Sequence, residues 1–315
     1  DLFQIDAPAD VTWDAFVRYE AIVFTVPVVT GQRGSGSVRV FAESPGAYQA
    51  QISWASSSGE RGLAVCPFAI VAGSALSLAP QRVRVDGKYD VWAPTGWDAM
   101  HVNQYERSAL AAVAKHVRPG AAAYDVGANL GLYTMPLLQL VGPAGFVYSF
   151  ELNPVCVHFL QATVRGAGHT NCSIFPVALG EADGSLTATI NYGSTALGIT
   201  SESAFFAAKL GCHVTVPCVR LDRVVEQFAT RAPDFIKIDV EGAEAMVVTG
   251  MEGTLARHRP VLLLELHGRG AALATLARLD RFGYTIEDLE SSRRADESAA
   301  FLDGLPDRPI QVLCL

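Results

Sequence analysis

From about residue 99 onward, two patterns of hydrophobic and polar positions alternate along the chain. Short apolar runs between turn residues are typical of buried strands, and longer segments with apolar residues every three or four positions are typical of helices. The pattern predicts strands at 121–126, 145–151, 172–178, 234–239, 260–266, 283–289 and 309–315. It predicts helices at 104–117, 131–140, 154–167, 221–229, 243–257 and 270–282. Apolar strands that alternate with helices indicate an α/β fold with a doubly wound, mostly parallel sheet.

The first part of the chain has a different pattern. Short β-prone segments occupy 21–30, 37–44, 47–56 and 81–94, and turn residues separate them. We therefore expect a small β-rich module at 1–100 and the α/β domain at 101–315. The glycine-rich "GQRGSGS" at 31–37 is predicted to be a hairpin tip, because no helix follows it. The module's role, in substrate binding or in contacts between copies of the chain, stays open.

One uncharged stretch, 62–81, approaches the length of a membrane span. It contains Pro67 and Gly73, and Arg61 and Arg82 flank it. Two buried strands with a turn at 72–74 explain it better, so we expect no membrane insertion.

Composition narrows the choice of partners and compartment. The formal net charge of −8 argues against nucleic acid as a partner. The six cysteines form no C-x-x-C pair, which is typical of reduced thiols in a cytoplasmic protein. We expect no zinc site, because neither cysteines nor histidines cluster at ligand spacing.

Polar side chains stand where the predicted strands end, which is where doubly wound sheets bind their ligands. These residues are Asp125, Glu151, Asp239, Glu241, Glu265 and His267.

The first of these strand ends reads "YDVGANLGLYT" (124–134) and resembles a nucleotide-binding turn. A dinucleotide fingerprint would have glycine at position 125, where a carboxylate would repel a pyrophosphate. Asp125 suits an ammonium group instead, and S-adenosylmethionine has one. Glu151 lies 20 residues after Gly131, at the usual place of an acid that binds ribose hydroxyls in either cofactor.

The motifs "YDVGANLGLYT", "FVYSFELNP", "FPVALGEADG" and "DFIKIDVEGAEAMVVTGM" together resemble the FkbM-type family of S-adenosylmethionine-dependent methyltransferases. The match runs from about Tyr105 to Gly268. It implies the Rossmann-like class I fold with a seven-stranded sheet. Members of the family methylate mostly hydroxyl oxygens of sugars, glycolipids and bacterial natural products, so we expect a small-molecule acceptor.

The resemblance also implies roles for single residues. Residues expected around the methionine part of the cofactor are Asp125, Gly127, Asn129 and Gly131. Glu151 is expected to bind the ribose, while Val177 and Ala178 are expected near the adenine, with Glu181 close by. Residues 239–244 would face the substrate, and Asp239 would also lie beside the cofactor.

A hydroxyl acceptor must lose its proton, and this favours a general base near the transferred methyl group. Candidates for this role are Asp239, Glu241 and His267, and candidates for substrate contact are Lys237, Glu244 and Tyr192. Glu241 and Glu244 have an alternative role as caps of the helix that follows. Mg²⁺ held by Asp239, Glu241 and Glu244 is a further hypothesis, which the capping alternative weakens.

The stretch 180–220 is irregular and rich in hydroxyl side chains. In the family this region helps to form the acceptor pocket, where Ser194 and Thr195 would join Tyr192 and where Phe205 and Phe206 would add an apolar surface. A surface hairpin with a helix explains the pattern equally well.

Two other functions stay open on sequence. One is an NAD-dependent or nucleotide-sugar-dependent oxidoreductase, against which Asp125 argues. The other is a non-catalytic binding protein with a vestigial cofactor site, and homo-oligomers are compatible with each function.

Overall fold

The computed structural model describes residues 80–94, 106–191, 211–228, 230–296, 298, 301 and 308–315. Before residue 80 it describes Ser58 and the backbone of the strands between residues 4 and 76.

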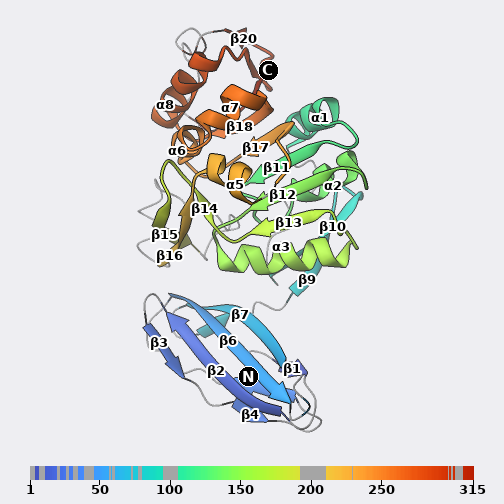
Figure 1. Cartoon of the computed structure of the whole chain (residues 1–315), viewed down its shortest axis with the longest axis vertical. Coiled ribbons are helices and arrows are strands. Elements are labelled where there is room, and N and C mark those ends of the chain that lie inside the picture. Colours follow the sequence, from blue (N-terminus) through green and yellow to red (C-terminus); the bar gives the residue numbers. More distant parts are fainter. Residues whose placement is uncertain are drawn as a thin grey trace.

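An eight-stranded sheet forms the centre of the C-terminal domain, in the order β13–β12–β11–β17–β18–β21–β19–β20 (Figure 1). Its strands are β11 (Ala122–Val126), β12 (Phe146–Phe150), β13 (Cys172–Phe175), β17 (Phe235–Ile238), β18 (Val261–Leu266), β19 (Ile286–Asp288), β20 (Arg294–Ala295) and β21 (Ile310–Cys314). The first five strands in this order pair in parallel, and β21 runs antiparallel to both β18 and β19. Strand order reverses beside β11, so the ends of β11 and β17 lie together at the switch point.

Helices cover both faces of this sheet. They are α1 (Arg107–His116), α2 (Thr134–Val141), α3 (Pro154–Gly166), α5 (Leu221–Gln227), α6 (Glu244–Thr249), α7 (Glu252–His258) and α8 (Arg269–Leu279), which a 3-10 turn at Asp280–Phe282 extends. Alternate strand residues pack into opposite layers: Tyr124 and Ile236 with helices α5 to α8, Ala123 and Phe235 with α1 to α3. The predicted doubly wound α/β fold is therefore confirmed, but the sheet has eight strands and not the seven expected, because the two-residue strand β20 pairs with β19 at the edge.

One predicted helix, 243–257, is in fact two helices, because the chain breaks between α6 and α7 at Gly250. A Cβ at Gly250 would lie 2.0 Å from the carbonyl oxygen of Gly180, so this turn is packed directly against another backbone segment. Asp222 then starts α7: its carboxylate accepts hydrogen bonds from the backbone N–H groups of Gly253 (2.9 Å) and Thr254 (2.6 Å). The contacts that split the helix thus come from distant parts of the sequence.

The strand predicted at 172–178 is also divided. Its first half is β13, and its end is β14 (Ala178–Leu179), which belongs to a separate sheet with β16 (Gly211–Val219) and β15 (Gly184–Asn191). The hairpin expected in 180–220 is thus present, although residues 192–210 lie outside the described part of the chain.

The N-terminal region contains strands, as predicted. They are β1 (Gln4–Asp6), β2 (Val11–Tyr19), β3 (Ile22–Thr25), β4 (Val28–Thr30), β5 (Ser35–Val38), β6 (Gly46–Ser56), β7 (Arg61–Val71) and β8 (Ser74–Leu76). The uncharged stretch forms the antiparallel pair β7–β8. Strand β4 precedes the glycine-rich segment, and β5, which is antiparallel to β4, contains its residues 35–37. Among the residues that the structure describes, no helix is long and apolar enough to span a membrane.

The hairpin of β9 (Pro80–Val85) and β10 (Tyr89–Pro94) packs into the α/β domain, although the sequence grouped it with the front module. Val85 and Val91 are fully buried in the same core layer as α1, α2 and α3. The hydroxyl of Tyr89 donates to the carbonyl of Leu132 (2.9 Å), and the Trp92 N–H donates to Oγ1 of Thr163 (2.8 Å). These residues therefore share the core of the C-terminal domain.

Candidate active site

The loop after β11 turns sharply and lies against the end of β17. Gly127 has a φ of +76°, and its N–H and that of Ala128 both donate to the carbonyl of Phe150 at 3.0 Å. A Cβ at Gly127 would lie 1.8 Å from the carbonyl oxygen of Asp239. This glycine is required by close packing, and the packing brings the predicted cofactor loop into contact with the predicted reacting edge.

Asp125 is fully buried behind this loop. Its Oδ2 accepts a hydrogen bond from the Thr134 hydroxyl (2.6 Å), and its Oδ1 lies 3.6 Å from Nζ of Lys237. Oδ1 has no hydrogen-bond partner among the described residues. Burial raises the pKa of this carboxyl group, and Lys237 and Thr134 oppose that shift. Asp125 therefore contacts residues that hold the loop, Thr134 and Lys237, from its buried side. Its direct contact with a ligand stays a prediction.

Glu151 fixes the other side of the loop. Its carboxylate accepts the backbone N–H of Asn129 (2.8 Å) on one oxygen and that of Asn153 (2.7 Å) on the other. Asn129 needs this support because its φ of +49° is a left-handed conformation. Burial raises the pKa of Glu151 to about 7 despite the two N–H donors. Each oxygen keeps a free lone pair, which is the acceptor chemistry that a ribose diol requires.

Lys237 joins the loop to the reacting edge. Its ammonium donates to the carbonyl of Gly127 (2.9 Å) and lies 3.3 Å from Oδ2 of Asp239, as well as close to Asp125. It also lies 4.9 Å from the ring centroid of Tyr133. Burial alone would lower the pKa of Lys237, but the charges of Asp239 and Asp125 outweigh it and raise the pKa. The side chain is almost wholly buried, and its substrate contact stays a prediction.

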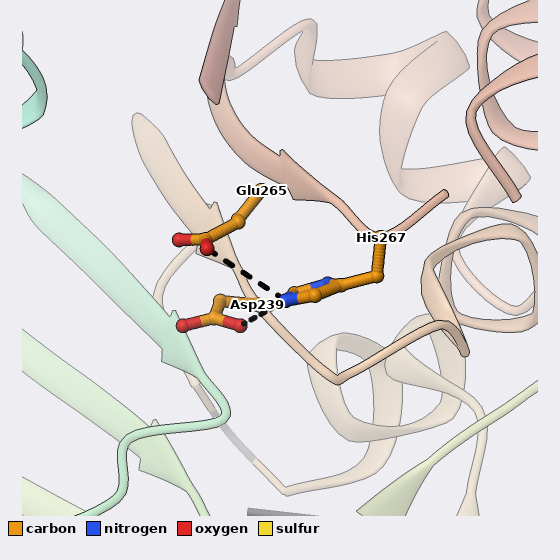
Figure 2. Close-up of side chains that lie close together, drawn as sticks. All are labelled: Asp239, Glu265 and His267. Carbon is orange, nitrogen blue, oxygen red and sulfur yellow. Dashed lines mark ion pairs between the residues drawn. The ribbon is translucent and has the colours of Figure 1, made fainter. Parts of the chain in front are cut away.

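Three carboxylates surround one ring nitrogen of His267. Its Nε2 lies 3.4 Å from Oε2 of Glu241, 3.7 Å from Oε1 of Glu265 and 3.8 Å from Oδ1 of Asp239. Figure 2 shows the side chains of Asp239, Glu265 and His267 pointing toward one another. The other ring nitrogen, Nδ1, lies 2.9 Å from Oε1 of Glu244. The prediction that Glu265 and His267 face the same side of their strand end is confirmed.

The charges of these groups shift one another's pKa values. Burial alone would lower the pKa of His267, but the hydrogen bond to Glu244 and the charges of Glu241 and Asp239 raise it to about 9. Burial, followed by the charges of Asp239 and Glu106, raises the pKa of Glu265 to about 7. Burial also raises the pKa of Glu241, whose φ of +53° is a second left-handed conformation at this site. Such strained backbone is common at functional sites.

Glu244 contacts both the turn before α6 and the ring of His267, and its substrate contact stays a prediction. It begins α6, is fully buried, and its Oε1 accepts the backbone N–H of Gly242 (2.9 Å) while also contacting His267. A surface helix cap would not be enclosed in this way. Glu244 therefore supports the imidazole from behind.

A polar network that the sequence did not indicate continues from Glu265. Nε2 of Gln311 donates to Oε2 of Glu265 (3.1 Å) and to Oε2 of Glu106 (2.6 Å), which the Tyr133 hydroxyl also contacts. A cavity of about 320 Å³ adjoins this network. Its lining residues are Glu106, Arg107, Ser108, Glu265, Leu289, Glu290, Arg308, Pro309 and Gln311. Only the register that pairs Glu265 with Gln311 across β18 and β21 brings these segments together.

The remaining predicted residues lie elsewhere. Val177 packs against the core beside β14, Ala178 is buried within it, and Glu181 is exposed. Gly131 has a φ of +99° and packs against Leu160. Tyr192, Ser194, Thr195, Phe205 and Phe206 lie outside the described residues.

Comparison with known proteins identifies the family. The family described as "Methyltransferase FkbM domain" matches residues 125–286, which is just over half of the chain. The chain belongs to the FkbM methyltransferase family. The resemblance read from its motifs is thus confirmed, and with it the assignment to the S-adenosylmethionine-dependent methyltransferases of class I fold.

Individual FkbM proteins are distant relatives. The 31-O-demethyl-FK506 methyltransferase FkbM of Streptomyces tacrolimicus is 28% identical over 196 residues, which are 54% of this chain and 75% of that protein. A solved FkbM methyltransferase of Methylobacillus flagellatus is 16% identical with a TM-score of 0.43. That match covers 70% of this chain and 60% of the solved one, less than two thirds of its length. An O-methyltransferase of Thermotoga maritima is 13% identical with a TM-score of 0.41, over 98% of this chain and 93% of that one.

Proposed function

We propose that this FkbM methyltransferase transfers the methyl group of S-adenosylmethionine to a hydroxyl oxygen of a small molecule. The acceptor classes that we consider are sugars, glycolipids and bacterial natural products. The observation that carries the proposal is the position of Lys237, whose ammonium touches both the carbonyl of Gly127 and the carboxylate of Asp239. A cofactor on the Gly127 loop would thus lie directly beside a cluster of proton-accepting groups. The Streptomyces relative, by its name, acts on an oxygen of its acceptor.

The loop after β11 fits the cofactor. S-adenosylmethionine has no phosphate, so no phosphate needs to be bound near the buried Asp125 carboxylate. Glu151 holds two rigid acceptor oxygens for the ribose hydroxyls. When bound, S-adenosylmethionine supplies a methyl group already activated by a sulfonium, so alignment and exclusion of water account for much of the rate.

The cavity beside Glu265 is our candidate for the acceptor site. At about 320 Å³ it is near the lower end of the range for ligand pockets, so it suits a small acceptor or one end of a larger one. Glu106, Glu265 and Gln311 offer hydrogen-bonding groups at its wall, which favours an acceptor rich in hydroxyl groups.

We assign the removal of the acceptor's proton to the polar side chains at the ends of β17 and β18. Asp239, Glu241 and His267 remain the candidates, and Asp239 is the strongest of them. Its carboxylate is partly exposed (22%), and its backbone touches the cofactor loop. Its Oδ2 lies 3.3 Å from Nζ of Lys237, which fixes the orientation of the carboxylate.

Calorimetric titration tests the cofactor assignment. The protein is expected to bind S-adenosylmethionine and its product S-adenosylhomocysteine, and not NAD. Glu151→Gln should weaken the affinity for S-adenosylmethionine at least tenfold, because an amide replaces one of the two acceptor oxygens. Glu252→Gln is the matched control, since Glu252 pairs with Arg281 on the surface of α7. Binding of NAD alone would refute the proposal and favour an oxidoreductase.

A further inference from the structure

The geometry points to a divalent cation site formed by Asp239, Glu265 and His267 at the ends of β17 and β18. The candidate ligand atoms are Oδ1 of Asp239, Oε1 of Glu265 and Nε2 of His267 (Figure 2). The binding of a cation is independent of the proposed function, whereas its use in methyl transfer rests on that function.

The three side chains already stand close to coordinating distance. One ligand atom from each lies within 4.8 Å of the other two, and Nε2 is 3.7 Å and 3.8 Å from the two carboxylate oxygens. Atoms bound at about 2.1 Å to a common octahedral ion are roughly 3 Å apart when adjacent and about 4.2 Å apart when opposite. Small side-chain rotations would therefore complete the site.

Each ligand is held from behind through its other polar atom. Nδ1 of His267 contacts Glu244, Oε2 of Glu265 accepts from Gln311, and Oδ2 of Asp239 faces Lys237. The other atoms of the three side chains, Nε2, Oε1 and Oδ1, are the ones that converge. Metal-binding histidines usually donate their second ring N–H to a carboxylate. Such a carboxylate holds the proton on Nδ1 and leaves the lone pair of Nε2 for the metal.

A buried carboxylate gives the second, independent observation. Glu244 is fully buried, and its Oε2 has no hydrogen-bond partner among the described residues. Together with Asp239, Glu241 and Glu265 it forms a group of four acids around His267. Among the described residues of the site, these acids outnumber the basic groups beside them, Lys237 and His267 itself. Enclosed like charges repel strongly, and a divalent cation at the centre would neutralise them.

The ligand set differs from the one expected from the sequence. The metal hypothesis from the sequence, which was not the favoured one, included Glu244 among the ligands. Glu244 lies at Nδ1, on the far side of the ring from the converging atoms, so Glu265 replaces it. Glu241, whose Oε2 is 3.4 Å from Nε2, is not part of the group whose ligand atoms all lie within 4.8 Å of one another. Two oxygens with one imidazole nitrogen and no sulfur suit Mg²⁺ or Mn²⁺. Such an ion would polarise the acceptor's hydroxyl and ease the loss of its proton.

Manganese serves as the probe, because free Mn²⁺ is counted directly by electron paramagnetic resonance. The protein, freed of metals by chelation and dialysis, is expected to bind one Mn²⁺ per chain, which Mg²⁺ displaces. Asp239→Asn and His267→Gln should each weaken Mn²⁺ binding at least tenfold. Glu244→Gln should weaken it about 10- to 100-fold, as the loss of a supporting partner does in known metal sites. Glu252→Gln should bind Mn²⁺ like the unmodified protein.

The cation site would be overturned if the unmodified protein did not bind Mn²⁺. It would also be overturned if Asp239→Asn, His267→Gln and Glu244→Gln bound Mn²⁺ as tightly as the unmodified protein. Thermal melting with and without Mn²⁺ guards against misfolded variants: the ion should raise the melting temperature of the unmodified protein and of Glu252→Gln only. S-adenosylmethionine titrations on the same samples separate the two proposals. Cofactor binding and turnover without Mn²⁺ binding would remove the cation site alone, whereas Mn²⁺ binding without cofactor binding would remove the proposed function alone.

Discussion

The carbonyl oxygen of Asp239 occupies the space beside Gly127 that any side chain at that position would need. The distance from this oxygen to a Cβ built on Gly127 is 1.8 Å. One residue of the predicted cofactor loop and one of the predicted reacting edge are therefore in direct backbone contact. The position of the loop depends on that contact.

Gly127→Ala should accordingly disrupt both folding and cofactor binding. The left-handed conformation alone costs about 1–2 kcal/mol, and the clash with Asp239 adds about 1–3 kcal/mol. Gly168→Ala is the matched control, because Gly168 has a similar φ of +73° with nothing within 4 Å of the added Cβ. Urea unfolding and S-adenosylmethionine titration measure both effects. Equal losses in the two variants would show that packing against Asp239 is unimportant.

The turn between α6 and α7 gives a prediction about stability alone. Asp222 accepts hydrogen bonds from the N–H groups of Gly253 and Thr254 and from the Thr254 hydroxyl. Asp222→Ala should therefore lower the free energy of unfolding by about 2 kcal/mol, near the upper range for a helix cap. Glu226→Ala, which removes only an exposed ion pair with Arg257, should change it by less than about 1 kcal/mol. Denaturant unfolding of both variants is the measurement, and a loss no larger in Asp222→Ala would contradict the cap.

The pKa of Glu151 predicts how stability depends on pH. Burial raises it from 4.5 to about 7, so the folded protein binds this proton more tightly than the unfolded chain does. The contribution of Glu151 to stability is thus fully present below pH 4.5 and is lost as pH rises to about 7. Glu151→Gln should flatten this part of the pH profile of unfolding. An unchanged profile would mean that Glu151 titrates normally.

Cofactor binding should shift the same group in the opposite direction. Ribose hydroxyls that donate to Glu151 favour its ionised form, so binding should release a proton near pH 7. Calorimetry in two buffers of different ionisation enthalpy counts the protons released. Glu151→Gln should release fewer protons on cofactor binding than the unmodified protein. Equal proton release by the two proteins would show that the ribose does not bind at Glu151.

The local pattern of apolar and polar positions predicted the parallel part of this fold, because apolar runs there are followed by a polar residue and a turn. Asp125 is the penultimate residue of β11, and Glu151 and Asp239 directly follow β12 and β17. Family resemblance added the cofactor, which the glycines alone could not identify.

Non-local contacts explain what the sequence did not predict. Glu106 and Gln311 are 205 positions apart and meet only because β21 inserts antiparallel beside β18. The break at Gly250 follows from its contact with Gly180, which no local pattern records. Likewise, the sequence places Glu244 at a helix start but cannot show that the carboxylate turns inward onto His267.

Turnover of Asp239→Asn tests the central claim, that a hydroxyl is deprotonated and methylated where Asp239 meets the Gly127 loop. Release of S-adenosylhomocysteine is followed with a panel of hydroxylated acceptors, at saturating S-adenosylmethionine, for the unmodified protein and the variant. With an acceptor that the unmodified protein methylates, we predict a kcat for Asp239→Asn that is lower by at least about 100-fold, the usual contribution of a general base. Its affinity for S-adenosylmethionine should change less than about twofold, since the cofactor contacts of Glu151 remain. An unchanged kcat in the variant would contradict the account.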